Sequence, residues 1–131
     1  MRRTWTIALL GLLTASGVAF AATVPRALAP AMGGLWEVSR NAAGHSPTRI
    51  CVASPDLLAQ FEHRQQRCTR SVVSDRGTET LISYNCPGGG FGQSKMTLIT
   101  PRTLRIETQG IADNLPFHYQ LHARRIGDCG R

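Results

Sequence analysis

Residues 96–107 read MTLITPRTLRIE, and this stretch decides the fold class. Met96 and Leu98 lie before the central Pro-Arg pair, Leu104 and Ile106 lie after it, and the intervening residues are mostly polar. Successive side chains of a strand point to opposite faces of its sheet. The Pro-Arg centre is typical of a turn. The stretch therefore predicts two antiparallel strands, each with one buried face and one face in solvent.

The same alternation continues in both directions along the chain. Ile82 and Tyr84 share one face of an earlier segment, and Phe117, Tyr119 and Leu121 share one face of a later segment. The predicted strands are 36–39, 48–52, 69–75, 78–86, 92–100, 103–110 and 117–126. We therefore expect a mainly β fold, which is a curled antiparallel meander or partly closed barrel of six to seven strands with one short helix.

The helix is expected within residues 54–67. Ser54 is a favourable N-cap, Pro55 suits the first helical position, and Asp56 places negative charge near the positive end of the helix. The apolar residues that recur at helical spacing are Leu57, Leu58 and Phe61. We expect this helix to cover an opening of the curled sheet.

The N-terminus has the three parts of an export signal. A positively charged start precedes an uncharged apolar run at residues 5–18, and Ala19-Phe20-Ala21 places small residues at the positions that a signal peptidase reads. The apolar run is shorter than the roughly 20 residues that cross a bilayer as a helix. We expect cleavage after Ala21, export to the periplasm, and no transmembrane anchor after signal cleavage.

The composition is compatible with one small domain. The chain has 131 residues, 42% hydrophobic and 6% aromatic, and a formal net charge of +7. Most of the positive charge comes from dispersed arginines without the interleaved aromatic residues that stack on bases, so we expect no nucleic-acid binding. The charge is interpreted as attraction to anionic envelope surfaces or as a solubility feature. The expected organisation is a signal peptide at 1–21, a flexible lead-in at 22–33 and a single disulfide-stapled β domain at 34–131.

The four cysteines point to structural disulfides. An even number of cysteines in a short exported chain predicts two bridges among Cys51, Cys68, Cys86 and Cys129. Three pairings are possible, and sequential pairing would stabilise the domain by on the order of 3 to 4 kcal/mol for each bridge through chain entropy. Zinc sites usually take cysteines in pairs two to four residues apart, and the chain has no such pair.

Four short motifs together resemble a known family. They are GLWEV at 34–38, CVASPD at 51–56, CPGG at 86–89 and RIGDC at 125–129. In combination they resemble the domain-of-unknown-function family 3617 over nearly all of residues 33–129. The resemblance implies a small exported bacterial protein with the same four cysteines and an all-β fold. It implies no activity.

The histidines do not predict a metal site. His118 and His122 lie four residues apart in a predicted strand, and at ~3.3 Å per residue they are about 13 Å apart, too far for one ion to bridge them. Solvated positions on the sheet face are the better interpretation. His45 and His63 occur in a loop and at a polar helix end, with no further ligand nearby in the sequence. We expect no metal and no cofactor.

The sequence also lacks a recognisable catalytic constellation. The closest match to the Gly-x-Ser-x-Gly elbow of serine hydrolases is 92–96, and it lacks the closing glycine. Ser94 and Lys95 are adjacent in a predicted strand, so their side chains point to opposite faces. The glycine-rich segment 88–92 precedes no helix, and we interpret it as a wide turn or bulge, or as a mobile lip at the mouth of a pocket. The protein is therefore expected not to be an enzyme.

Two functional hypotheses remain. The favoured one is a periplasmic, non-catalytic binding module that holds a small apolar ligand or peptide against large residues on inward faces. Those candidate ligand-lining residues are Trp36, Tyr84, Phe117 and Tyr119. The alternative is an envelope interaction or stress-related protein whose basic outer face contacts a partner protein or an anionic surface. The residues assigned to that face are Arg105, Arg124 and Arg125.

Overall fold

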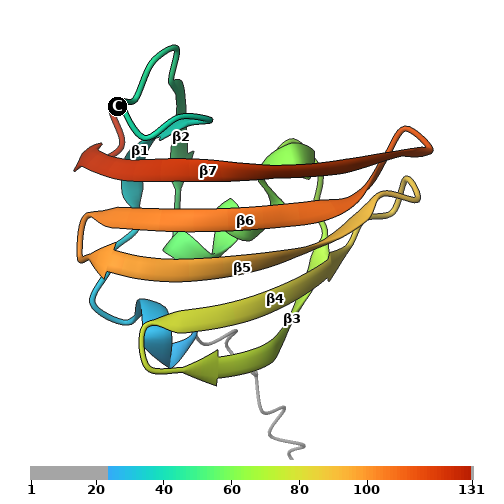
Figure 1. Ribbon diagram of the computed structural model, residues 1–131, viewed down its shortest axis with the longest axis horizontal. Helices are drawn as coiled ribbons and strands as arrows, with labels where there is room; N and C mark the ends of the chain where they lie inside the picture. The colour runs from blue at the N-terminus through green and yellow to red at the C-terminus, as the bar shows by residue number, and fades with distance from the viewer. Residues whose placement is uncertain (1–23, 131) are drawn as a thin grey trace, which may run out of the picture.

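A single antiparallel sheet makes up most of the structure, a computed structural model that describes residues 24–130. Its seven strands follow the order β2-β1-β7-β6-β5-β4-β3 (Figure 1). The strands are β1 Gly34–Ser39, β2 Thr48–Val52, β3 Thr69–Arg76, β4 Glu79–Asn85, β5 Phe91–Thr100, β6 Thr103–Ala112 and β7 Leu115–Gly127. The predicted mainly β meander is confirmed. The predicted signal peptide at 1–21 lies outside the described residues.

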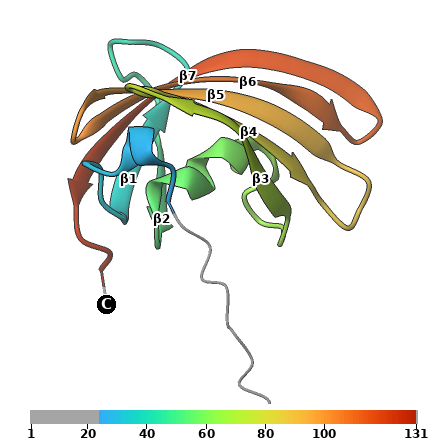
Figure 2. The same cartoon turned by 90° about the horizontal axis from the view of Figure 1, so that it is seen from below.

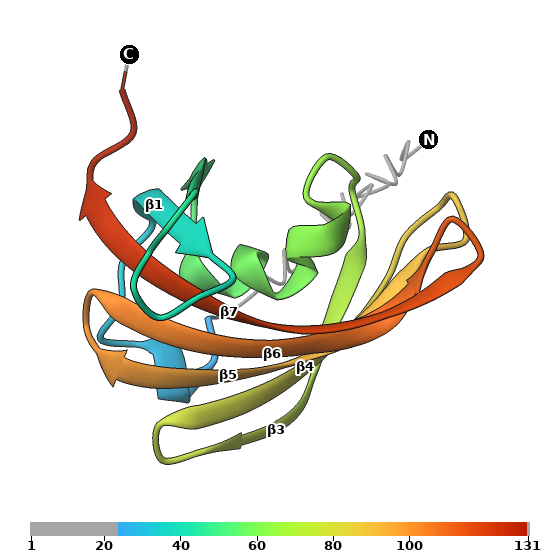
Figure 3. The ribbon, with the colours of Figure 1, turned by 45° about the horizontal axis from the view of Figure 1, so that its top comes forward.

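The sheet curls strongly but stays open. Figures 2 and 3 show it arching over the segment between β2 and β3, which lies against the concave face. The edge strands β2 and β3 do not pair with each other, so the sheet does not close into a barrel. The sheet is therefore the curled meander of the prediction, and it is not a closed barrel. Within residues 24–130, no helix has the length and apolar character needed to cross a membrane.

The core fills the concave side of the sheet. Leu104, Ile106 and Leu121 are almost completely buried there, and Leu58 packs on the same cluster from the segment that the sheet encloses. Arg105 and Glu107 alternate with the buried residues of β6 and point to the convex side. The alternation that predicted the strands therefore also identifies which side chains face the core.

The expected helix is shorter and tighter than its sequence suggests. It is the 3₁₀ helix η2, Pro55–His63, and it is interrupted at Gln60, whose φ and ψ are −99° and 33°. The Ser54 side chain does not cap a backbone amide and donates to the Asp56 carboxylate instead. The helix ends at His63, within the predicted range, because the chain turns there and leads to the cysteine before β3.

The lead-in is packed against the sheet in the part that the structure describes. Arg26–Leu28 forms the short 3₁₀ helix η1, and the Leu28 side chain is completely buried. The Asp75 carboxylate accepts hydrogen bonds from the backbone N–H groups of Arg26 and Ala27, at 2.7 and 2.9 Å. A flexible lead-in is therefore the wrong description of these residues, because a carboxylate in β3 fixes them.

All four cysteines form disulfides, and the pairing is not sequential. Cys51 at β2 pairs with Cys129 after β7, whereas Cys68 pairs with Cys86 across the start of β3 and the end of β4. The two bridges span 78 and 18 residues. Each one ties an edge strand of the open sheet to a neighbouring segment. Two disulfides fit a protein that resides outside the cytoplasm, in an oxidising compartment.

Candidate functional site

A row of polar side chains crosses four strands on the convex face. Ser83 in β4 is paired with Gln93 in β5, Gln93 with Gln109 in β6, and Gln109 with His118 in β7. The residues that follow the first three in sequence, Tyr84, Ser94 and Gly110, belong to the opposite, helix-covered face by alternation. The polar row is therefore a line of amide, hydroxyl and imidazole groups in solvent contact.

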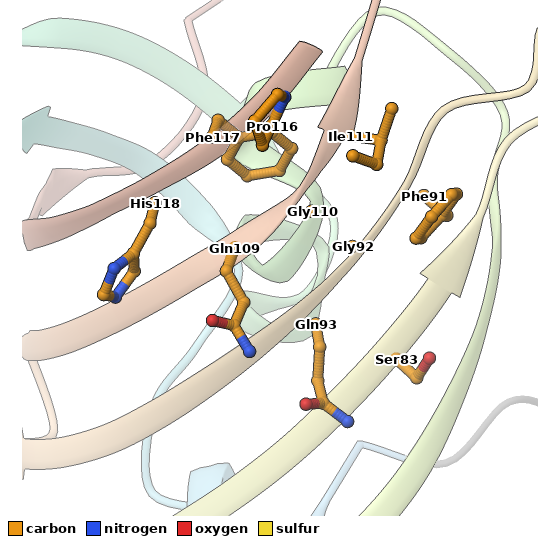
Figure 4. Close-up of a pocket in the computed structure, with 10 residues that line it drawn as sticks. All are labelled: Ser83, Phe91, Gly92, Gln93, Gln109, Gly110, Ile111, Pro116, Phe117 and His118. Atoms are coloured by element: carbon orange, nitrogen blue, oxygen red, sulfur yellow. The ribbon is translucent and has the colours of Figure 1, made fainter. Parts of the chain in front are cut away.

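A second row, of apolar side chains, lies two residues farther along the same strands. Phe91 in β5 is paired with Ile111 in β6, and Ile111 with Pro116 in β7. Phe91 is 48% exposed, although it is among the largest apolar residues of the chain. We call the space between the polar row and the apolar row the convex groove. Its lining residues are Ser83, Phe91, Gly92, Gln93, Gln109, Gly110, Ile111, Pro116, Phe117 and His118 (Figure 4).

The convex groove is broad and shallow, with a volume of about 720 Å³. Its floor is the backbone around the paired residues Gly92 and Gly110. A Cβ atom on Gly92 would lie 2.5 Å from the Tyr84 hydroxyl oxygen, and one on Gly110 would lie 2.1 Å from the Phe91 carbonyl oxygen. Only glycine fits at these two positions, because Gly92 leaves room for the Tyr84 side chain and Gly110 permits the close approach of β5 and β6.

A buried cluster supports the groove from the concave side. The His63 ring, at the end of η2, lies 5.5 Å from the Tyr84 ring and 5.9 Å from the Phe117 ring, centroid to centroid. His63 Nδ1 and the Tyr84 hydroxyl are 3.0 Å apart and form a hydrogen bond. His63 Nε2 is buried without a hydrogen-bond partner among the described residues and faces Gly90, where a Cβ would lie 2.2 Å away.

Tyr119 continues this cluster toward solvent. Its hydroxyl donates to the Glu62 carboxylate, and the Arg40 guanidinium lies 4.1 Å from the centre of its ring. Burial, followed by the hydrogen bond and the negative charge of Glu62, raises the pKa of Tyr119 above its usual value. Burial, together with the charge of Glu62, raises the pKa of Tyr84 to about 12. Both phenols are therefore neutral at physiological pH.

The four residues expected to line an internal ligand site have different roles. Trp36 is completely buried in the core and donates its indole N–H to the Met32 carbonyl at 3.2 Å. Tyr84 is 1% exposed and bonded to His63, so these two side chains fill the interior. Tyr119 is half-buried beside Glu62, and Phe117 alone of the four lines the convex groove. Trp36 and Tyr84 are therefore core residues, and neither lines the convex groove.

The histidines of β7 lie as expected on the convex side. His118 contacts Glu107 at 3.5 Å, and Lys95 contacts the same carboxylate at 3.3 Å. The hydrogen bond from Lys95, with a smaller contribution from His118, lowers the pKa of Glu107. Within the described residues, no three histidine, cysteine or acidic side chains are grouped closely enough to hold a metal ion.

The arginines assigned to a basic outer face are mostly engaged with other groups. Arg124 contacts Glu37 at 3.1 Å, and hydrogen bonding from Arg124, followed by Arg49, lowers the pKa of Glu37. The Arg125 side chain is 12% exposed, donates to the Gly33 carbonyl and contacts an aspartate near the C-terminus. Arg105 is exposed and has no ion pair among the described residues. Of the three arginines, Arg124 and Arg125 therefore have acidic partners and Arg105 has none among the described residues.

Comparison with known families supplies the classification. The family described as "Protein of unknown function (DUF3617)" matches residues 28–129, which is most of the chain. The chain belongs to this family. The DUF3617 match begins at Leu28, which the core buries, and ends at Cys129, which is disulfide-bonded. No curated protein and no solved structure matches the chain significantly.

Sequence reasoning missed the central residues of the groove. Gln93, Gln109 and Ile111 have ordinary strand positions, and only the register across β4 to β7 brings them into rows. His63 was interpreted as part of a polar helix end, whereas it is 5% exposed beneath the glycine-rich turn before β5. Gly92 and Gly110, at the ends of two predicted strands, were the available signal, since glycine within a strand often marks close backbone approach.

Proposed function

We propose that this DUF3617 protein is a periplasmic, non-catalytic binding module that holds a small apolar ligand or an extended peptide in the convex groove. The observation that carries the proposal is the pair of parallel rows, one apolar and one rich in amides, on the two sides of a glycine floor. The site assigned to the ligand therefore moves from the interior to the outer surface of the sheet.

The size and chemistry of the groove support this proposal. Its volume of about 720 Å³ lies within the roughly 300 to 1,000 Å³ of typical ligand pockets. The two rows are two residues apart along the strands, or roughly 6.7 Å. An elongated ligand can therefore lie across the strands, with apolar groups against Phe91 and Ile111 and polar groups facing Gln93 and Gln109. Apolar walls supply affinity, and the few amides supply orientation.

The cellular location is proposed from two independent features. Residues 1–21 have the charge and hydropathy pattern of an export signal. Both disulfides require an oxidising environment to persist. The periplasm satisfies both conditions, and a ligand there is either a small apolar molecule or an exposed segment of an envelope protein.

A dye-binding experiment tests the proposed site. Nile red, an uncharged apolar dye, is titrated into the protein lacking residues 1–21 and followed by its fluorescence. Gln93→Trp places a large ring between the two rows and is expected to abolish binding. Thr97→Trp is the matched control, because it adds the same ring to the same strand and face, four residues away. Equal dye affinity in both variants would show that the convex groove is not the site.

The alternative, an envelope interaction or stress-related protein that uses a basic outer face, has less support. Of its three arginines, Arg124 is paired with Glu37 and Arg125 is largely covered. The one of the three without an ion pair among the described residues, Arg105, is flanked on its strand by Glu107. Vesicle association that persists in Arg105→Ala would remove the remaining basis for this function.

A further inference from the structure

A second pocket lies on the other side of the sheet, where the loop between β1 and β2 meets the end of η2. Its volume is about 360 Å³. The inner wall is apolar and includes Val38 and Leu121. The polar side chains that line it are Arg40, His45, Ser46, Thr48, Glu62 and Arg64. We call this space the arginine pocket.

Aromatic rings hold the two guanidinium groups of the arginine pocket. The Arg40 guanidinium carbon lies 4.1 Å from the centre of the Tyr119 ring, and that of Arg64 lies 4.5 Å from the centre of the Phe61 ring. Arg64 Nη1 also donates to the Phe61 carbonyl at 3.0 Å. A guanidinium that contacts a ring through its face keeps N–H donors at its edge for another partner.

Neither of these arginines is neutralised by an acidic side chain within residues 24–130. Some other basic side chains of the described residues do form ion pairs with Asp or Glu. The arginines and the lysine that make them are Arg49, Arg70, Lys95, Arg124 and Arg125. Arg40 and Arg64 thus place two positive charges without ion-pair partners at one pocket.

The loop that forms the other wall is held in place before any ligand binds. The Ser39 hydroxyl donates to the His45 carbonyl at 2.7 Å, and the His45 backbone N–H donates to Asn41 Oδ1 at 3.0 Å. These bonds fix the position of Ser46, which follows and lines the pocket. A preformed wall lowers the entropy cost of binding, because little of the loop has to be ordered by the ligand.

Glu62 is the one carboxylate among the residues that line the pocket. It accepts the hydrogen bond of the Tyr119 hydroxyl, so one of its oxygens is already engaged. With two arginines against one glutamate, the pocket keeps an excess positive charge. The net positive charge of the pocket therefore favours an anionic ligand, and Glu62 weakens that preference without reversing it.

We propose that the arginine pocket binds a phosphate group, in a small phosphorylated molecule or in a lipid headgroup. Guanidinium edges match phosphate oxygens with paired, charge-assisted hydrogen bonds. Ser46 and Thr48 add hydroxyl donors for the remaining oxygens. The pocket opens on the helix side, whereas the convex groove lies on the opposite face, so this site is independent of the proposed apolar ligand.

Calorimetric titration with inorganic phosphate at low ionic strength tests the site. Arg40→Lys and Arg64→Lys retain the positive charge but lose the paired N–H donors of the guanidinium group. Each is expected to weaken phosphate binding by about tenfold or more. Arg67→Lys is the matched control, since this exposed arginine lies near Arg64 and does not line the pocket. Glu62→Gln removes the opposing charge and is expected to strengthen binding. Equal affinities in all four variants, or an equal loss in the Arg67 control, would overturn the proposal.

Vesicle sedimentation distinguishes the two sources of the phosphate group. Vesicles of phosphatidylcholine with and without phosphatidylglycerol are incubated with the protein and its Arg40→Lys variant. Binding that requires the anionic lipid and is lost in the variant assigns the pocket to a headgroup. Phosphate binding in solution without vesicle binding assigns it to a soluble phosphorylated molecule. The absence of both kinds of binding contradicts the proposal.

Discussion

The hydrogen bond between His63 and Tyr84 offers a sharp test of how the groove is supported. Both side chains are buried, at 5% and 1% exposure, and the His63 Nδ1 and Tyr84 hydroxyl atoms are 3.0 Å apart. Tyr84→Phe leaves the imidazole nitrogen buried without its partner. The desolvation of one such group costs about 1 to 3 kcal/mol of unfolding free energy. For a domain of this size, that corresponds to a fall in melting temperature of roughly 4 °C or more per kcal/mol.

A double-mutant cycle separates the lost bond from lost packing. Adding His63→Leu to Tyr84→Phe removes both polar partners, so the double variant is expected to recover part of the loss, with a coupling of about 1 kcal/mol or more. Guanidinium unfolding is followed by the fluorescence of Trp36, the only tryptophan within the described residues and completely buried there. Additive losses would refute the bond. Loss of Nile red binding in Tyr84→Phe at unchanged stability would show instead that Tyr84 contacts the ligand.

Three further results are expected. Replacing both cysteines of a bridge by serine should lower the free energy of unfolding by about 4.5 kcal/mol for Cys51–Cys129 and about 3 kcal/mol for Cys68–Cys86, because these bridges span 78 and 18 residues. Guanidinium unfolding that ranks the two variants in the opposite order would contradict the loop-entropy argument. Absorbance at 295 nm should show no tyrosinate near pH 10 in the folded protein, because the pKa values of both tyrosines are raised. The free energy of unfolding is therefore retained below the unfolded-state tyrosine pKa of about 10 and falls as the pH rises above it. Ordinary tyrosine titration at pH 10 in the folded protein would refute the burial of the two phenols. Gly110→Ala should destabilise the fold by about 1 to 3 kcal/mol, since its Cβ would lie 2.1 Å from a carbonyl oxygen. Gly127→Ala is the control and should change stability little, because its Cβ would have open space around it. Similar thermal unfolding of the two variants would refute the close strand approach.

The strand pattern was accessible from the sequence because one side of each later strand is apolar. Leu104 and Ile106 indicated both the strand and its buried face correctly. The same pattern could not indicate whether the inward face encloses a cavity. Trp36 and Tyr84 do point inward, yet η2 and η1 fill the space that they face. Alternation reports the direction of a side chain and carries no information on what lies opposite it.

Long-range pairing limited the other predictions. The bridge between Cys51 and Cys129 depends on β1 lying between β2 and β7, and strand order is not contained in a local pattern. The lead-in was expected to be loose because it has no periodicity, whereas Asp75, far along the chain, fixes it through two hydrogen bonds. The convex groove depends likewise on register, since a shift of one residue would send Gln93 to the opposite face.

Mapping of a ligand onto the two faces of the sheet tests the proposed binding function most directly. Amide chemical shifts of isotope-labelled protein are recorded by NMR during titration with n-octanol, an uncharged apolar molecule. The largest changes are expected in Phe91–Gln93 of β5 and Gln109–Ile111 of β6, with little change at Trp36 or in η2. Changes confined to Trp36 and η2, or no saturable change anywhere, would contradict the assignment of the convex groove as the ligand site.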